Sequence, residues 1–158
     1  MDPHPSGPGE HPRPARPFTV GPARRVLDRL MVPLVRRGLV PHTYLLTTTG
    51  RTSGLPRTVP VTLVERDGRR WLVAPYGPVS WVHNARAAGR VHLRRGHVAQ
   101  ECAVREVGPQ EAGPVLKAYL AITGPPRRWF EADKDAPVED FVAEAPAHPV
   151  FELVPLRD

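Results

Sequence analysis

The sequence predicts an α+β fold in which six mostly antiparallel strands form a small barrel with flanking helices. Three observations support this prediction: six short runs rich in β-branched and aromatic residues, turn signals between consecutive runs, and helical periodicity in the segments around them. Strands joined by tight turns pair antiparallel, and such strands can close into a barrel. The expected strands are 43–49, 58–65, 71–74, 91–94, 98–107 and 150–154.

The second strand shows the pattern most clearly. Its apolar residues Val59, Val61 and Leu63 alternate with Thr, Pro and Thr, and this period of two is typical of a strand with one buried face. The Asp-Gly pair at 67–68 predicts a hairpin turn into the third strand.

The first expected helix, Ala23–Arg37, carries an apolar stripe opposite its arginines. Pro33 removes one backbone hydrogen bond inside it, so we expect a kink or two short helices. The stripe favours packing on the sheet, and peripheral membrane contact through residues 23–37 is the alternative. Further helices are expected at 78–88 (closed by Gly89), 109–122 and 138–145, with an irregular charged segment at 125–137.

Length and composition indicate one domain. The 158 residues are 41% hydrophobic with a mean hydropathy of −0.33, and they include neither a membrane span nor a secretory signal, so we expect a cytoplasmic protein. Prolines crowd residues 1–17, which predicts a disordered tail ahead of a single domain at 18–158. Cys102 is the sole cysteine, and this excludes an internal disulfide.

The charge is unevenly distributed. Residues 1–100 hold 16 Arg against 5 acidic residues, whereas residues 101–158 hold 6 basic and 11 acidic residues. The basic part predicts an anionic ligand, a nucleic acid or an acidic lipid surface as partner. Aromatic residues make up only 6% and no nucleic-acid-binding motif is present, so we expect no nucleic acid.

Several kinds of catalytic site lack support. No histidine pair has the spacing of metal ligands, so no metal is expected. The serine in Gly50–Gly54 lies one place away from the position of a nucleophile elbow. Cys102 falls in a predicted strand, where a buried inert thiol is expected. A domain without its own acid, base and nucleophile set generally takes its chemistry from a cofactor.

The loop 50–57, Gly-Arg-Thr-Ser-Gly-Leu-Pro-Arg, is the first candidate site. Its glycines permit positive φ and expose backbone N–H groups, its Thr and Ser add hydroxyl donors, and Arg51 and Arg57 supply fork-shaped charge. Such a concave turn can bind phosphate. A polar hairpin loop that binds nothing is the alternative.

Residues 74–84, Ala-Pro-Tyr-Gly-Pro-Val-Ser-Trp-Val-His-Asn, are the second candidate. Trp81 and Asn84 lie three residues apart and therefore share a helix face. An aromatic ring beside an amide suits the edge of a planar heterocycle. A core tryptophan with Asn84 bonded to nearby backbone is the alternative.

Four stretches then occur in a characteristic order. They are Leu45-Leu-Thr-Thr-Thr-Gly-Arg-Thr-Ser-Gly-Leu-Pro-Arg-Thr-Val-Pro60, Trp71-Leu-Val-Ala-Pro-Tyr-Gly77, Trp81-Val-His-Asn-Ala-Arg-Ala-Ala-Gly-Arg90 and His148-Pro-Val-Phe-Glu-Leu-Val-Pro155. Together they resemble the deazaflavin-dependent nitroreductases over about residues 24–156. The resemblance implies an FMN-binding split barrel-like fold that holds coenzyme F420, an 8-hydroxy-5-deazaflavin.

The resemblance also implies roles for individual residues. Those of the loop would hold the phosphate and acidic tail of the cofactor, those of the second strand would lie against its ring, and those of 73–84 would line its other edge. Two positions depart from the family pattern, since many members have Lys where this chain has Thr52 and where it has Tyr76. The implied cofactor-binding residues are Arg51, Thr52, Ser53, Gly54, Arg57, Val59, Pro60, Val73, Ala74, Pro75, Tyr76, Gly77, Trp81 and Asn84.

The resemblance implies an oxidoreductase that transfers a hydride from the reduced deazaflavin to a small electrophilic acceptor such as a quinone, nitroaromatic or activated enone. Tyr76 is the candidate catalytic residue, as proton donor or substrate-positioning group. An FMN-dependent oxidoreductase and a non-catalytic deazaflavin carrier are the alternatives. The oligomeric state stays open.

Overall fold

The computed structural model describes residues 22–123 and 125–157. The tail expected over residues 1–17 lies outside this part of the chain. The described elements are α1 (Pro22–Arg36), β1 (Thr43–Thr49), β2 (Pro56–Arg66), β3 (Arg69–Val73), α2 (Ser80–Ala88), β4 (Arg90–Arg95), β5 (Val98–Glu106), α3 (Pro109–Ile122), the 3-10 helix η1 (Pro125–Trp129), α4 (Val138–Glu144), the 3-10 helix η2 (Ala145–Ala147) and β6 (Val150–Pro155).

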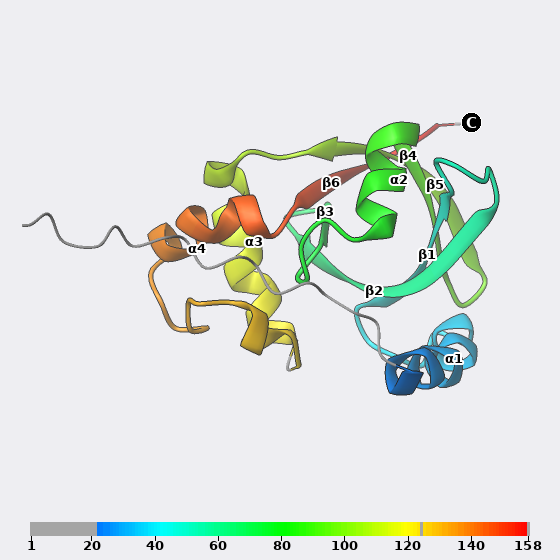
Figure 1. The fold of residues 1–158 in the computed structure, drawn as a ribbon, viewed down its shortest axis with the longest axis horizontal. Helices are drawn as coiled ribbons and strands as arrows, with labels where there is room; N and C mark the ends of the chain where they lie inside the picture. The colour runs from blue at the N-terminus through cyan, green and yellow to red at the C-terminus, as the bar shows by residue number, and fades with distance from the viewer. Residues whose placement is uncertain (1–21, 124, 158) are drawn as a thin grey trace, which may run out of the picture.

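The six strands form a closed barrel in the order β1-β2-β3-β6-β5-β4, and every neighbouring pair is antiparallel (Figure 1). This confirms the predicted fold class. The β2–β3 turn has the positive φ angles expected of an Asp-Gly hairpin, 52° at Asp67 and 72° at Gly68. Three pairings join strands distant in sequence and close the barrel: β1 with β4, β3 with β6, and β5 with β6.

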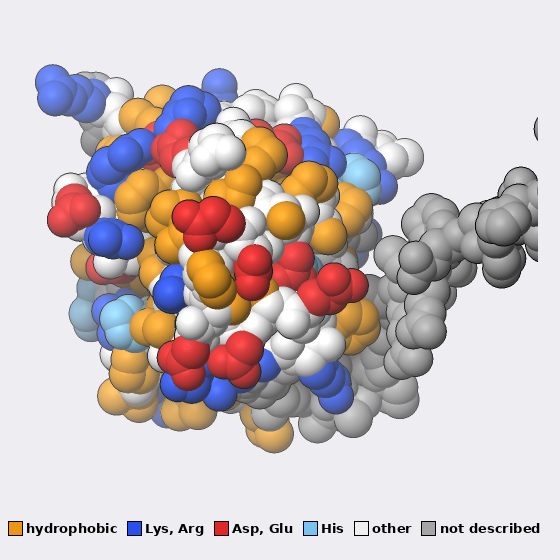
Figure 2. Space-filling view, turned by 90° about the vertical axis from the view of Figure 1, so that its left-hand side faces the viewer, with side chains coloured by type: hydrophobic (Ala, Val, Ile, Leu, Met, Phe, Trp, Pro, Cys, Tyr) orange, Lys and Arg blue, Asp and Glu red, His pale blue; other side chains and the backbone are white. Residues whose placement is uncertain are grey.

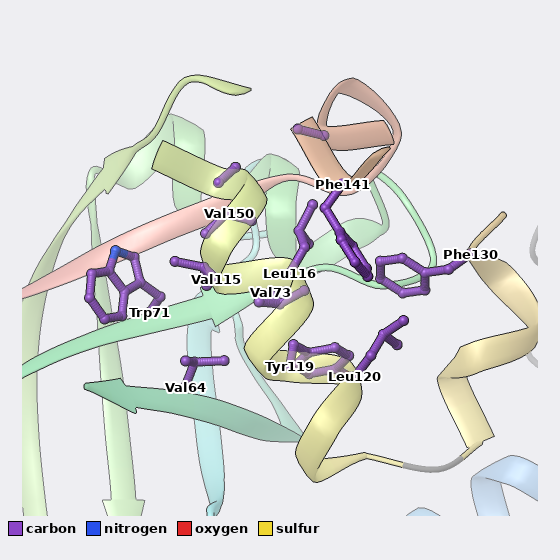
Figure 3. Close-up of a cluster of buried hydrophobic side chains, with 12 residues drawn as sticks. Val64, Trp71, Val73, Val115, Leu116, Tyr119, Leu120, Phe130, Phe141 and Val150 are labelled. Carbon is purple, nitrogen blue, oxygen red and sulfur yellow. The ribbon is translucent and has the colours of Figure 1, made fainter. Parts of the chain in front are cut away.

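Side chains alternate between the two faces of the barrel wall and build two cores. The inner core fills the barrel and includes Leu63 of β2 and Leu72 of β3. The outer core packs α3 and α4 against the outside of β2, β3 and β6, and Figure 3 shows Val64 and Trp71 on this side. Consecutive residues of one strand therefore serve different cores. The core that a side chain faces therefore limits whether that side chain can reach the candidate site.

One of the alternatives predicted for α1 is wrong. The helix continues through Pro33 without a break, so two short helices do not form. Val35 is fully buried, whereas Leu30 and Leu34 are 64% and 40% exposed, and α1 contacts β1, β2 and β4. In the described part of the chain, every helix is too short or too polar to cross a membrane.

Other boundaries shift by a few residues. β2 begins at Pro56, two residues before the expected start, because Pro56 and Arg57 pair with Thr49 and Thr48. β3 begins at Arg69 and α2 begins at Ser80, and Gly89 ends α2 with a left-handed φ of 70°, as predicted. The segment 125–137, expected to be irregular, contains the helix η1.

An ion-pair network covers the outside of β3, β5 and β6. Glu152 accepts hydrogen bonds from Arg69 (Nε to Oε1, 2.7 Å) and from Arg105, and Glu111 of α3 accepts from the same two arginines at 3.0 and 2.7 Å. The hydrogen bonds from Arg69 and Arg105 lower the pKa of Glu152 from 4.5 to about 2. The network joins α3 to three strands.

We expect Glu152→Gln to lower the free energy of unfolding at pH 7 by about 1–2 kcal/mol, less than the full pKa shift, because the arginines are half-exposed. The pKa of Glu152 is lower in the folded state, so its stabilisation is complete above pH 4.5 and disappears as the pH falls toward 2. Urea unfolding at pH 7 and pH 3 measures the difference, with Glu139→Gln at an exposed position as control. An equal loss at both pH values would contradict this assignment.

Candidate functional site

The two predicted site segments meet at one end of the barrel. Because the strands run antiparallel, β1 ends, β2 begins and β3 ends at this edge. The loop 50–55 joins the first two strands there, and the turn 74–77 leaves the third. α2 follows that turn and lies over the same end, where Val82 and Ala85 join the inner core.

The loop has a closed backbone conformation. The Gly50 N–H donates to the Leu55 carbonyl and the Gly54 N–H donates to the Gly50 carbonyl, both at 2.8 Å. Gly54 has a φ of 70°, which a residue with a side chain rarely adopts. Ser53 Oγ accepts from the Leu55 N–H at 3.2 Å, so this hydroxyl supports the loop. All residues from 51 to 57 are exposed.

Asn84 anchors this loop to the barrel. It is only 3% exposed, and its Oδ1 accepts from both the backbone N–H and the Nη1 of Arg51, at 3.1 and 3.0 Å. Its Nδ2 donates to Thr48 Oγ1 at 3.2 Å. Because the amide is neutral, it fixes the position of Arg51 without cancelling the arginine's charge. The hydrogen bonds of Asn84 thus join Arg51 of the loop to Thr48 of β1.

Strand alternation separates two residues that the resemblance places against the ring. Val59 packs against the inner core, so Pro60, the next residue, faces the opposite side of the sheet. Arg57 has the same parity as Val59, and its partner in β1 is Thr48, the residue that Asn84 contacts. Arg57, Val59 and Asn84 therefore belong to one side of the sheet, and Pro60 belongs to the other.

The turn 74–77 and the preceding Val73 of β3 are mostly buried. The Val73 side chain belongs to the outer core (Figure 3), so it supports this segment from behind, whereas Ala74 faces the inner core. Tyr76 is half-buried and packs edge-to-face against Trp129, with ring centroids 5.5 Å apart and planes at 84°. Trp81 is also half-buried.

The opposite end of the barrel is closed by polar contacts. Tyr44 donates its phenol proton to Glu65 Oε1 at 2.6 Å, and Arg95 lies 5.7 Å from the Tyr44 ring centroid. Arg70 donates to Gln100 Oε1 at 2.5 Å. Burial and the contact with Glu65 raise the pKa of Tyr44. Tyr44 and Glu65 bond to each other, as do Arg70 and Gln100, so the α2 end is the better candidate for a ligand site.

Among the residues that the structure describes, the remaining reactive and ionisable groups do not form a second site. Cys102 is fully buried, and burial raises the pKa of its thiol, as expected for an unreactive cysteine. Figure 2 shows carboxylates dispersed over the side of the molecule that α3 and α4 form. Within the described ranges, no three His, Cys, Asp or Glu side chains are grouped as metal ligands.

Sequence reasoning missed one contact of the turn. His148 is 5% exposed, and its Nδ1 lies 2.8 Å from the Pro75 carbonyl oxygen. The sequence offers one signal for His148, its place at the start of the stretch His148–Pro155. Nothing in its distance along the chain from Pro75 indicates that the two residues meet. Long-range contacts of this kind become visible only in the fold.

We expect Asn84→Asp to preserve the fold and weaken deazaflavin binding by roughly tenfold or more, about 1.4 kcal/mol. The carboxylate would still accept from Arg51, but it would neutralise that charge and repel an anionic ligand. Fluorescence titration measures the affinity, and Gln110→Glu on exposed α3 adds the same charge far from the loop. Equal affinities of the Asn84→Asp variant and this control would contradict the role of Asn84.

The described residues fit the cofactor that the resemblance implies. Arg51 and Arg57 are exposed and suit a phosphodiester and glutamate carboxylates, which guanidinium groups bind in bidentate fashion. Val59 and Trp81 supply apolar surface at the same barrel end, as the ring of a deazaflavin requires.

Solved structures of known proteins share this architecture. An F420H2-dependent reductase, FDR-A, is 26% identical with a TM-score of 0.52, covering 72% of this chain and 94% of its own. A conserved protein from Mycobacterium tuberculosis is 18% identical with a TM-score of 0.54, covering 94% and 87%. A Listeria innocua protein, provisionally named a pyridoxamine 5'-phosphate oxidase, is 11% identical with a TM-score of 0.51, covering 83% and 94%. The last two support the split-barrel fold alone.

A family comparison identifies the group of proteins to which the chain belongs. Residues 26–127 match the sequence model of the F420H2-dependent quinone reductases. The match includes the loop, the turn and α2, which carry the predicted cofactor-binding residues, and it confirms the resemblance on which those predictions rest. The chain therefore belongs to the F420H2-dependent quinone reductase family.

Proposed function

We propose that this protein binds coenzyme F420 at the α2 end of its barrel and reduces a small electrophilic acceptor. The observation that carries the proposal is the anchoring of Arg51 by Asn84, which fixes a cationic loop beside the turn 74–77. Family membership supports the cofactor. A quinone is the acceptor class that the family name favours, while nitroaromatics and activated enones share the required electrophilic character.

Each part of the site has a distinct task in this proposal. Arg51 and Arg57 bind the phosphate and carboxylates, while the loop conformation that Gly54 permits, with its internal backbone hydrogen bonds, supports Arg51. Val59 and Trp81 hold the ring and exclude water. When bound, the reduced cofactor supplies a hydride, which together with one proton converts a quinone to a hydroquinone.

Tyr76 is the residue that we propose to act on the acceptor. Its half-buried ring packs edge-to-face against Trp129 of η1, and this contact helps to position the phenol. We assign it the placement of the acceptor and the delivery of a proton from its Oη.

A turnover assay tests the proposal. The wild-type protein, reduced deazaflavin and a soluble quinone should together restore the visible absorbance of oxidised deazaflavin faster than the mixture without protein. An equal rate in both mixtures, despite tight cofactor binding, would contradict the enzyme and favour a carrier. Turnover with reduced FMN in place of deazaflavin would favour the flavin alternative.

A second proposal concerns the surface around α1. Leu30, Leu39 and Val98 are each at least 64% exposed, and the Gly96 N–H donates to the Val35 carbonyl at 3.4 Å, which brings the β4–β5 hairpin next to the end of α1. Exposed Arg29, Arg36 and Arg37 surround these apolar side chains. We propose that this face contacts anionic lipid, because apolar anchors with basic neighbours suit such a surface.

Vesicle sedimentation tests the lipid contact. Leu30→Gln combined with Leu39→Gln should lower binding to anionic vesicles by about tenfold, since two exposed anchors are lost. Exposed Leu55 lies in the loop at the α2 end, so Leu55→Gln is the matched control and should bind like the wild type. Lack of wild-type binding to anionic vesicles, or equal binding of all three proteins, would contradict this proposal.

A further inference from the structure

The segment that precedes β6 is bonded directly to the turn 74–77. The Ala74 N–H donates to the Pro149 carbonyl at 2.8 Å. The neighbouring residues, Pro75 and His148, are also in contact, because His148 Nδ1 lies 2.8 Å from the Pro75 carbonyl oxygen. Both histidine and proline are buried, so this contact is shielded from water.

The same segment lies beside the next part of the turn. Gly77 has a φ of 86°, and a Cβ built at this position would lie 3.5 Å from the Ala147 carbonyl oxygen. The Gly77 N–H donates to the Ala74 carbonyl at 3.2 Å. Residues 147–149 therefore lie along the turn, and the positive φ at Gly77 is what favours glycine there.

The hydrogen bond to Pro75 determines where the His148 proton resides. A carbonyl oxygen can only accept, so Nδ1 must carry the proton. Burial lowers the pKa of His148, and the ring is therefore neutral near pH 7, with its proton on Nδ1 and an unprotonated Nε2. Glu144 Oε1 lies 3.7 Å from Nε2 and is the charged group that faces the ring.

The His148 ring also contacts the aromatic segment after η1. It stacks on Phe130 with centroids 4.0 Å apart and planes at 16°. Trp129, the neighbour of Phe130, packs against Tyr76 of the turn. Figure 3 shows Phe130 at the edge of the outer core, pointing toward Phe141. The turn, His148 and the segment 129–130 thus each contact the other two.

Glu144 completes this unit from α4. Its two carboxylate oxygens accept from the backbone N–H groups of Glu131 and Ala132, at 2.6 and 2.9 Å. The carboxylate therefore fixes the chain that follows Phe130, on the side of the imidazole opposite Pro75. The His148 imidazole therefore lies between the Pro75 carbonyl of the turn and the segment 129–130.

We infer that His148 is a positioning residue, which holds the turn 74–77 through the Pro75 carbonyl and couples this turn to Trp129. The inference rests on the proposed function, since it treats the turn as the cofactor wall and Tyr76 with Trp129 as the acceptor side. A histidine suits the place because it offers a donor at Nδ1 and a flat face for Phe130. Loss of the donor should loosen both sides of the site together.

The test compares two substitutions at the same position. In His148→Asn the amide nitrogen takes the place of Nδ1 and can still donate to Pro75, whereas in His148→Gln the amide reaches the place of Nε2 instead. Hydrogen exchange of the Gly77 amide in the protein without cofactor should be at least about tenfold faster in the Gln variant and within about threefold of wild type in the Asn variant. His92→Gln, on the exposed side of β4, is the matched control.

Cofactor titration and acceptor kinetics provide the functional readout. In His148→Gln the dissociation constant for deazaflavin and the KM for the quinone should rise together, each by about fivefold or more, and His148→Asn should restore both. Unchanged Gly77 exchange in His148→Gln would overturn the inference. If that variant does not fold, Trp129→Ala replaces it, and unchanged Gly77 exchange there would overturn the coupling. A wild-type protein that binds no deazaflavin would contradict only the proposed function, because Gly77 exchange is measured without cofactor.

Discussion

Replacement of both Arg51 and Arg57 by alanine should weaken deazaflavin binding by about 100-fold. Each guanidinium that binds a phosphate or carboxylate contributes about tenfold in affinity, or roughly 1.4 kcal/mol. Asn84 holds Arg51 in place before any ligand arrives, so little conformational entropy is lost when the ligand binds. The two effects should add if each arginine contacts a different anionic group.

Fluorescence titration with oxidised deazaflavin measures this loss. The control is Arg66→Ala combined with Arg94→Ala, because both residues are exposed and lie toward the opposite end of the barrel, so the same charge is removed from the whole protein. Affinity that falls equally in both double variants would mean that long-range charge, rather than the loop, binds the cofactor. Unchanged affinity in Arg51→Ala with Arg57→Ala would remove the loop from the site.

Phe141→Ala should lower the free energy of unfolding by about 3–5 kcal/mol, the cost typical of deleting a fully buried Phe side chain. Phe141 has no exposed surface and lies in the outer core with Leu116 and Phe130 (Figure 3). Its removal leaves a cavity between α3, α4 and the segment that carries Trp129. The loss of packing should therefore reach the acceptor side of the candidate site as well as global stability.

Urea unfolding of wild type and variant gives the size of the effect. Val154→Ala, at a half-exposed position of β6, should change stability by no more than about 0.5 kcal/mol. A change below about 1 kcal/mol for Phe141→Ala would show that the outer core can collapse into the vacated space. The packing of α4 would then not be a determinant of stability.

The strands could be predicted because their signals are local. The alternation of Val59, Val61 and Leu63 and the Asp-Gly turn after β2 depend on neighbours in sequence, and the structure contains both. The closing pairs β1–β4 and β3–β6 join segments far apart in the chain. No local pattern encodes their register, so the barrel could be inferred from the number of strands but not its strand order.

The site was predicted in its segments but not in its contacts. Residue types and family motifs identified the loop and the turn, and topology places both at one barrel end. The contact of Asn84 with Arg51 spans 33 residues and that of His148 with Pro75 spans 73, so neither follows from spacing. The resemblance placed both Val59 and Pro60 against the ring, whereas strand alternation puts them on opposite sides of the sheet, with Val59 packed against the inner core.

Parallel titration of the wild-type protein with oxidised deazaflavin and with FMN, each followed by its visible fluorescence, tests the central claim most directly. The proposed site predicts saturable binding of the deazaflavin with a dissociation constant on the order of micromolar, weakened by the double arginine variant, and much weaker binding of FMN. Preference for FMN would contradict the assigned cofactor while leaving the phosphate loop in place. Binding of neither would contradict the site itself.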